Sequence, residues 1–211
     1  MKITDISMTI HTGMPVYKDL PEKRPVLTME KMMPRDGINE SALYMNLHTG
    51  THFDSPLHMM EGGWTAEFLP LHKLLAPCRV LDLTRVTDGI AKEDLIPYGI
   101  KPDEFILLKT QNSYETKFNP DFIYLKKDAA VYLADTGIKG VGIDALGIER
   151  SQPGHATHLA LMEKDVLILE GLQLKDIEEG SYFMVALPIK IRDAEGAPAR
   201  VVLLDDLSFL H

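Results

Sequence analysis

Residues 127–143 read KDAAVYLADTGIKGVGI, and this stretch of the chain decides the fold class. Good helix formers occupy Lys127–Thr136 at helical spacing, and Gly137 follows where a helix is expected to end. Gly140–Ile143 then reads as a short β-strand. A helix that feeds directly into a strand is typical of α/β proteins, so we predict that class.

Comparable β-rich runs recur along the chain between turn signals. Some are apolar throughout and others alternate, which predicts a mixed central sheet that is covered on both faces and contains parallel and antiparallel pairs. Neither a repeat nor a linker divides the sequence, so we expect a single domain over residues 1–211, with a strand order that the sequence leaves open. Further strands are expected at residues 3–10, 43–48, 79–83, 105–108, 166–169, 182–187 and 200–204, and a further helix at 158–164.

Charge and composition exclude several classes of partner. The 211 residues carry 31 Asp and Glu against 22 Lys and Arg, which gives a formal charge of −9. This charge repels phosphate backbones and anionic membrane surfaces, so we expect neither nucleic acid nor a membrane as a partner. Asp5, His11 and Gly13 interrupt the first residues before an apolar run develops, which argues against a signal peptide and predicts a cytoplasmic protein. The single cysteine, Cys78, precludes a thiolate metal cage and is expected to be a core thiol.

Three histidines and one aspartate lie within residues 48–58, HTGTHFDSPLH. The alternation of residues 43–47 predicts a strand that ends near His48, and Pro56 predicts that His52, Asp54 and His58 sit on a fixed loop. Imidazole and carboxylate ligands without sulfur suit Zn²⁺, and also Mn²⁺ or Fe²⁺. The alternative is a set of loop histidines that stabilise turns.

A second cluster strengthens the prediction of a metal site. His155 and His158 lie three residues apart in PGHATH, and Glu170 ends the apolar run VLIL. A carboxylate beside such a run is costly to desolvate unless a cation or strong donors meet it, and a metal would satisfy it. The alternative for Glu170 is an exposed acid at a strand end.

Other catalytic motifs are missing or out of context. Gly140, Gly142 and Ala145 match G-x-G-x-x-A, but a helix precedes them and the strand runs through them, so a dinucleotide site is not expected. The sequence has no P-loop motif and no G-x-S-x-G nucleophile motif.

The stretch HTGTHFDSPLH resembles the H-x-G-T-H-x-D-x-P-x-H signature of the cyclase-like metal-dependent hydrolases, a family that includes bacterial kynurenine formamidase and isatin hydrolase. The resemblance covers nearly the whole chain. Its other landmarks are DIS and GMPVY near the N-terminus, VGID at 141–144, HATHLALMEKDVLILEGL at 155–172, and ALPIKI with GAPARVVLL near the C-terminus.

The resemblance implies a swivelling β/β/α fold and a hydrolytic site that holds one or two zinc ions, with manganese as an alternative. His48, His52 and Asp54 would bind one ion, and Asp54 would also reach a second. His158 would bind the second ion, and Glu170 would bridge both ions or complete the shell.

The resemblance also implies roles around the metals. His58 would be the catalytic proton shuttle. Tyr17 stands where the kynurenine formamidases carry a Trp that helps to hold an aryl substrate, so it would be a substrate-binding residue. His155 has no matching family role and is left open between a residue behind the ligands and a substrate contact.

The implied activity is that of a metal-dependent amidohydrolase, which uses metal-activated water to cleave a C–N bond of a small molecule. The leading interpretation is an arylformamidase of tryptophan catabolism, which converts N-formylkynurenine to kynurenine and formate. The alternatives are a lactam or lactone hydrolase of the isatin hydrolase kind and a metal- or ligand-binding module without turnover. The family and the segment 13–25, GMPVYKDLPEKRP, predict a homo-oligomer, dimer or tetramer; the alternative is an arm that folds on its own core.

Overall fold

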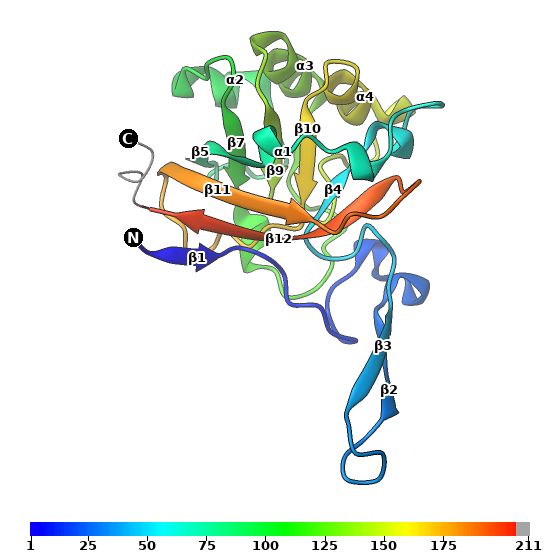
Figure 1. Cartoon of the computed structure of the whole chain (residues 1–211). Coiled ribbons are helices and arrows are strands. Elements are labelled where there is room, and N and C mark those ends of the chain that lie inside the picture. The colour runs from blue at the N-terminus through cyan, green and yellow to red at the C-terminus, as the bar shows by residue number, and fades with distance from the viewer. Residues whose placement is uncertain (206–211) are drawn as a thin grey trace.

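Eight strands form one mixed sheet that closes into a barrel-like ring (Figure 1). The computed structural model describes residues 1–205. The strand order is β1-β12-β11-β5-β7-β9-β10-β4, and β4 also pairs with β12, which closes the ring. The strands are β1 (Ile3–Asp5), β4 (His52–Asp54), β5 (Leu75–Asp82), β7 (Phe105–Lys109), β9 (Gly140–Ile143), β10 (Leu167–Glu170), β11 (Gly180–Pro188) and β12 (Gly196–Leu204).

The centre of the sheet is parallel and is buried on both faces. Strands β5, β7, β9 and β10 run in one direction, whereas β11 and β4 pair antiparallel with their neighbours. Along β7, Ile106 and Leu108 join one hydrophobic cluster, while Phe105 and Leu107 join the other. Helices α2 (Lys92–Leu95), α3 (Lys127–Thr136) and α4 (Ala156–Met162) cover the first cluster (Figure 1). These features confirm the predicted α/β fold with a mixed sheet.

The predicted helices are present with small differences in their ends. Helix α3 has the predicted bounds, and Gly137 follows it with a positive φ of 78°. The second helix, α4, begins two residues earlier than expected and ends at Met162. Other short elements include α1 (Leu71–Leu74) and the parallel pair β6 (Gly89–Ile90) and β8 (Tyr124–Leu125).

The prediction of a core strand at residues 43–48 is wrong. Strand β3 (Glu40–Tyr44) instead pairs with β2 (Val26–Lys31) in a separate antiparallel hairpin, and Leu43 is 52% exposed. His48 follows in a turn outside any strand. The alternating pattern was misleading because the strand ends at Tyr44 and leaves Leu43 exposed, while Leu47 packs against the core from the turn that follows.

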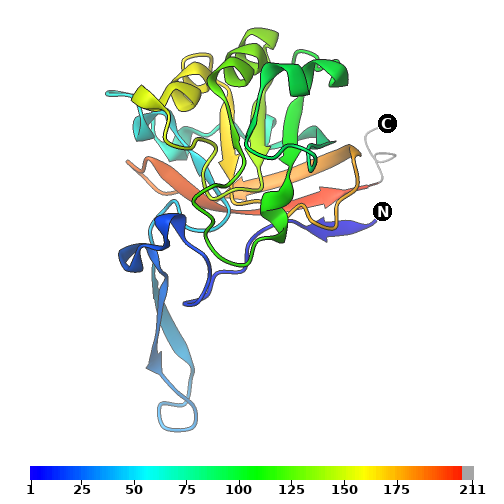
Figure 2. The same cartoon turned by 180° about the vertical axis from the view of Figure 1, so that it is seen from behind.

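The β2–β3 hairpin projects away from the ring in both views (Figures 1 and 2). All residues of both strands are exposed. The segment before the hairpin folds onto its own chain, since Met14, Val16 and Pro25 are buried. Among the described residues, no helix has the length and apolar character needed to cross a membrane.

Candidate metal centre

Strands β4 and β10 bring the two sequence clusters together. His52 and Asp54 are two residues apart on β4, so their side chains leave the strand on the same side. Glu170 is the last residue of β10 and lies opposite His52 in the strand register. The expectation that His52 and Asp54 sit on a loop is therefore wrong, because this segment adds a strand between β10 and β12.

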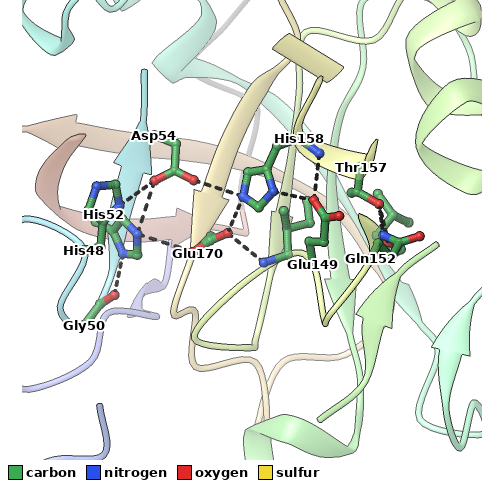
Figure 3. Close-up of polar contacts among 11 residues, drawn as sticks. His48, Gly50, His52, Asp54, Glu149, Gln152, Thr157, His158 and Glu170 are labelled. Carbon is green, nitrogen blue, oxygen red and sulfur yellow. Dashed lines mark hydrogen bonds and ion pairs between the residues drawn. The ribbon is translucent and has the colours of Figure 1, made fainter. Parts of the chain in front are cut away.

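Both carboxylates divide their oxygens between two histidines (Figure 3). His52 Nε2 lies 3.4 Å from Asp54 Oδ1 and 3.4 Å from Glu170 Oε2. On the other side, His158 Nε2 lies 3.6 Å from Asp54 Oδ2 and 3.6 Å from Glu170 Oε1. The geometry defines two adjacent positions, each surrounded by one imidazole nitrogen and two carboxylate oxygens.

The two imidazoles are held so that Nε2 faces this centre. His52 Nδ1 lies 2.9 Å from the carbonyl oxygen of Gly50, to which it donates a hydrogen bond. His158 Nδ1 lies 2.7 Å from Glu149 Oε2, and the backbone N–H of His158 donates to the same oxygen at 3.2 Å. Anchoring one ring nitrogen in this way is the usual preparation of a histidine that binds a metal through the other.

The nitrogen and oxygen atoms of this centre are arranged as ligands of a divalent ion and not as hydrogen-bond partners of one another. Within residues 1–205, five buried side-chain nitrogen or oxygen atoms lack a hydrogen-bond partner, and His48 Nε2, His52 Nε2 and Asp54 Oδ2 are three of them. Ligands at about 2.0–2.1 Å from a tetrahedral zinc lie about 3.4 Å apart, which matches the observed separations. Buried nitrogen and oxygen atoms that lack hydrogen-bond partners and have this spacing support a metal-binding centre.

Burial and charge shift the pKa values of the centre in opposite directions. Burial alone would lower the pKa of His52, but the neighbouring carboxylates of Asp54 and Glu170 outweigh it and raise that pKa to about 10. The pKa of His158 is likewise raised, since its carboxylate partners outweigh burial. Burial opposes ionisation of Asp54 and Glu170, yet contacts with the histidines hold both pKa values low.

His48 and His58 lie at the open side of the centre. His48 Nδ1 is 2.8 Å from Asp54 Oδ1, and its ring centre is 5.0 Å from that of His52. The ring of His58 lies 4.0 Å from that of His48 and 6.0 Å from that of His158. Burial lowers the pKa of His58, so its imidazole is neutral at pH 7.

A cavity of about 500 Å³ opens next to the centre and contains the other predicted site residues. Tyr17, His155, His58, His158 and Glu170 all line it. Burial and the nearby Glu170 raise the pKa of Tyr17, so its hydroxyl keeps its proton at neutral pH. His155 is exposed at the cavity wall, with its ring centre 6.3 Å from that of His158.

Two acids of the site were missed in the sequence. Glu149 anchors His158, and Glu195 Oε1 lies 3.4 Å from His48 Nε2. Glu149 is six residues from His155 and could have been found as a further acid near the second cluster. Glu195 gave no signal, since it reaches the site only because β12 pairs with β4. Gly196 beside it leaves room for His48, whose Cε1 would lie 2.9 Å from an added Cβ.

The surroundings of Asp144 and Cys78 indicate that both residues have structural roles. The Asp144 carboxylate accepts hydrogen bonds from the backbone N–H and the hydroxyl of both Thr110 and Ser113. Cys78 is buried, and burial raises its pKa to about 12, as befits a core thiol.

Comparison with known proteins agrees with this site and fold. Residues 4–150 match the family model Cyclase, described as "Putative cyclase". A kynurenine formamidase from Salinibacter ruber (strain DSM 13855 / M31) is 30% identical over 208 residues, which cover 97% of this chain and 98% of the relative.

Solved structures show the same fold. A "predicted metal-dependent hydrolase from Bacillus stearothermophilus" has a TM-score of 0.90 and 51% identity over 97% of this chain and 98% of its own. Isatin hydrolase A from Labrenzia aggregata has a TM-score of 0.84 over 97% of this chain and 94% of its own, at 21% identity, and so shares the fold.

The fold and the cluster of His, Asp and Glu side chains define a single-domain α/β protein with metal-binding groups, of the class to which metal-dependent hydrolases belong. The chain belongs to the cyclase family.

Proposed function

We propose that the chain is a metal-dependent amidohydrolase that converts N-formylkynurenine to kynurenine and formate. The observation that carries this proposal is the pair of carboxylates that share their oxygens between two anchored histidines, beside a neutral imidazole and an open cavity. The similarity to kynurenine formamidases along nearly the whole chain supports the substrate.

Two ions would be held by this chain's own donors. His52 Nε2, Asp54 Oδ1 and Glu170 Oε2 would hold the first, with a nitrogen of His48 completing the set. His158 Nε2, Asp54 Oδ2 and Glu170 Oε1 would hold the second. Ligands of nitrogen and oxygen without sulfur favour Zn²⁺, with Mn²⁺ as an alternative.

A bound divalent ion supplies Lewis acidity and lowers the pKa of water at the site. The remaining work falls to the protein. An imidazole nitrogen of His58 is unprotonated at neutral pH, so it can accept a proton and then deliver it to the departing anilide nitrogen. Asp54 and Glu170 remain ionised, so their negative charge would offset part of the charge of the bound ions.

The cavity would position the aryl group. Tyr17 presents a half-buried ring to it, and the ring is held by edge contacts with Phe118 at 5.5 Å and Phe122 at 6.3 Å between centroids. His155 lines the same cavity from the start of α4, so we assign it to substrate contact.

Two alternatives remain outcomes of the test. A lactam or lactone hydrolase would use the same centre with a different pocket, and the isatin hydrolase fold is compatible with it. A binding module would have no use for the spare imidazole of His58. The test is a panel of N-formylkynurenine, isatin and simple esters, assayed with and without chelator. Chelator-sensitive formamide cleavage is expected; preference for isatin would favour the lactam hydrolase, and no turnover at full metal occupancy would favour the binding module.

We also propose that residues 1–211 act as one domain and that two or more copies associate through the β2–β3 hairpin. Two isolated strands are marginally stable in water, yet within residues 1–205 this hairpin pairs with no other strand. It exposes a set of large apolar side chains: Val26, Leu27, Met29, Met32, Met33, Ile38, Leu43 and Tyr44. A second copy offers an identical hairpin, so the two surfaces can cover each other around a twofold axis.

A further inference from the structure

The cavity has a positively charged wall that the proposed reaction does not yet use. Lys18 and Lys23 line the cavity together with the metal-centre residues. Their ammonium nitrogens lie 5.4 Å and 5.2 Å from the centre of the Tyr17 ring. The two charges therefore share one small region, next to the ring that would contact an aryl substrate.

The backbone that carries these lysines is firmly placed. Lys18 and Asp19 both have positive φ angles, 58° and 53°, which non-glycine residues adopt only when the surroundings impose them. Arg24 pairs with Asp19 and donates a hydrogen bond to the Met14 carbonyl at 3.3 Å. The Lys23 carbonyl accepts a hydrogen bond from the hydroxyl of Thr49 at 3.0 Å. Strain of this kind beside a cavity is typical of functional segments.

Neither lysine forms an ion pair with a carboxylate anywhere in residues 1–205. Asp19, the acid next to Lys18, is taken by Arg24. The carboxylates that line the cavity face histidines instead: Glu149 and Glu170 lie beside His158, and Glu195 lies beside His48. Two like charges near one ring repel each other, and an anion bound beside them would offset that repulsion.

We propose that Lys18 and Lys23 select substrates that carry a carboxylate, and that they hold this carboxylate beside Tyr17 while the amide reaches the metal centre. This inference rests on the proposed function and narrows its substrate class to aryl amides that carry a carboxylate. The apolar ring of Tyr17 and the two ammonium groups together match a molecule with an aryl body and a carboxylate. A neutral lactam would leave both ammonium groups without a partner, so the same wall disfavours it.

The test compares two substrates that differ only in this charge: N-formylkynurenine and its carboxamide. The variant is Lys18→Met/Lys23→Met, which keeps the apolar stems. The matched control is Lys101→Met/Lys164→Met, which removes the same charge from exposed positions before β7 and β10, outside the cavity.

We expect the Lys18→Met/Lys23→Met variant to lower kcat/KM for N-formylkynurenine by about tenfold or more, mainly through KM, because two half-exposed charge pairs are lost. The carboxamide should change by less than about twofold, and the control should keep the wild-type ratio. Added salt should reduce the preference of the wild type for the carboxylate. An unchanged ratio in the variant, or an equal change in the control, would overturn the inference.

Failure of the proposed function gives a different result from failure of the lysine proposal. Wild-type protein that hydrolyses neither substrate would contradict the formamidase proposal. The lysine proposal would then be decided by calorimetric binding of kynurenine and its carboxamide to the same three proteins. Loss of selective kynurenine binding in the cavity variant would support it, and equal binding of both compounds by the wild type would refute it.

Discussion

His52 and His58 are six residues apart and are prepared for opposite tasks by their surroundings. His52 is fully buried between Asp54 and Glu170, which raise its pKa to about 10 despite the burial. His58 lies at the cavity, where burial dominates and lowers its pKa below 6.5. The first is suited to hold a cation in place of its proton, and the second is suited to exchange protons near neutral pH.

His58 provides the first prediction. His58→Gln should lower kcat by about 10²- to 10⁴-fold, because it removes the proton carrier and leaves the metal donors in place. Below its pKa, His58 is protonated and cannot act as a base, and because this pKa is lowered, wild-type activity should fall only at a pH below the ordinary histidine value of 6.5. Rate profiles and elemental analysis of both proteins check this. Loss of metal with unchanged turnover per metal would contradict the role.

The raised pKa values of His52 and His158 give the second prediction. Both rings are protonated on both nitrogens at pH 7 in the metal-free chain. Metal binding must therefore release protons and tighten as the pH rises toward 10. In the metal-free chain the same ion pairs stabilise the fold fully below the unfolded pKa of 6.5, and this contribution is lost as the pH rises through about 10. Calorimetry of Zn²⁺ binding in buffers of different ionisation enthalpy counts the protons. Binding without proton release would refute this description.

At this scale the sequence predicted which histidines and acids come together. Local spacing placed His52 with Asp54, and an acid after an apolar run pointed to Glu170. Glu149 and Glu195 escaped because their roles depend on which segments meet in space. The contact between Lys23 and the Tyr17 ring, which depends on a turn with unusual φ angles, was equally invisible.

At the scale of elements, the metal centre depends on a close passage of two chain segments, in which Gly50 before β4 lies against Gly171 after β10. Gly171 follows β10 with a φ of 70°, and a Cβ there would lie 2.3 Å from the carbonyl oxygen of Gly50. That same carbonyl anchors His52 through Nδ1. Thr51 strengthens the passage by donating its hydroxyl to the Gly171 carbonyl at 2.6 Å.

The third prediction therefore concerns Gly171→Ala. The added methyl group must displace Gly50, so we expect a loss of about 3 kcal/mol or more in the free energy of unfolding, together with weaker metal binding. Gly137→Ala is the matched control, since its φ is 78° and an added Cβ would meet nothing within 4 Å. It should cost about 1–2 kcal/mol and keep the metal. Equal effects of the two substitutions would show that the passage is unimportant.

Elements with strong local signals were predicted accurately, and two segments, residues 43–48 and β4, were not. Helix α3 was predicted from its helix-forming residues and from Gly137, which follows its last residue. The run at residues 43–48 has the correct period for a strand, but period alone does not say what covers it. The strand β4, which carries His52 and Asp54 between β10 and β12, arises from long-range pairing.

At the scale of the whole molecule, ring closure and the projecting hairpin are the two features that the sequence did not predict. Closure brings Glu195 and Gly196 to the site, whereas the hairpin leaves the body and carries apolar residues into solvent (Figure 2). The predicted oligomerisation segment, residues 13–25, is partly buried in its own chain, so the exposed surface lies farther along at residues 26–44.

The fourth prediction tests the hairpin as an intersubunit contact. Leu27 and Leu43 face each other across the two strands, so Leu27→Lys/Leu43→Glu keeps a favourable cross-strand pair while it removes the apolar surface. We expect this variant to shift the protein to monomers in sedimentation velocity. Ile96→Lys, at another half-exposed apolar position, should leave the assembly unchanged. Dissociation by the control alone would place the contact elsewhere.

A pair of ions held by His52, Asp54, His158 and Glu170 would make this chain a formamidase. The most direct measurement strips the protein with chelator, restores Zn²⁺ or Mn²⁺ in steps, and records both the bound metal per chain and the hydrolysis of N-formylkynurenine. We predict that activity is absent in the stripped protein and reaches its maximum near two ions per chain. Full turnover without metal, or none with both positions filled, would contradict the claim.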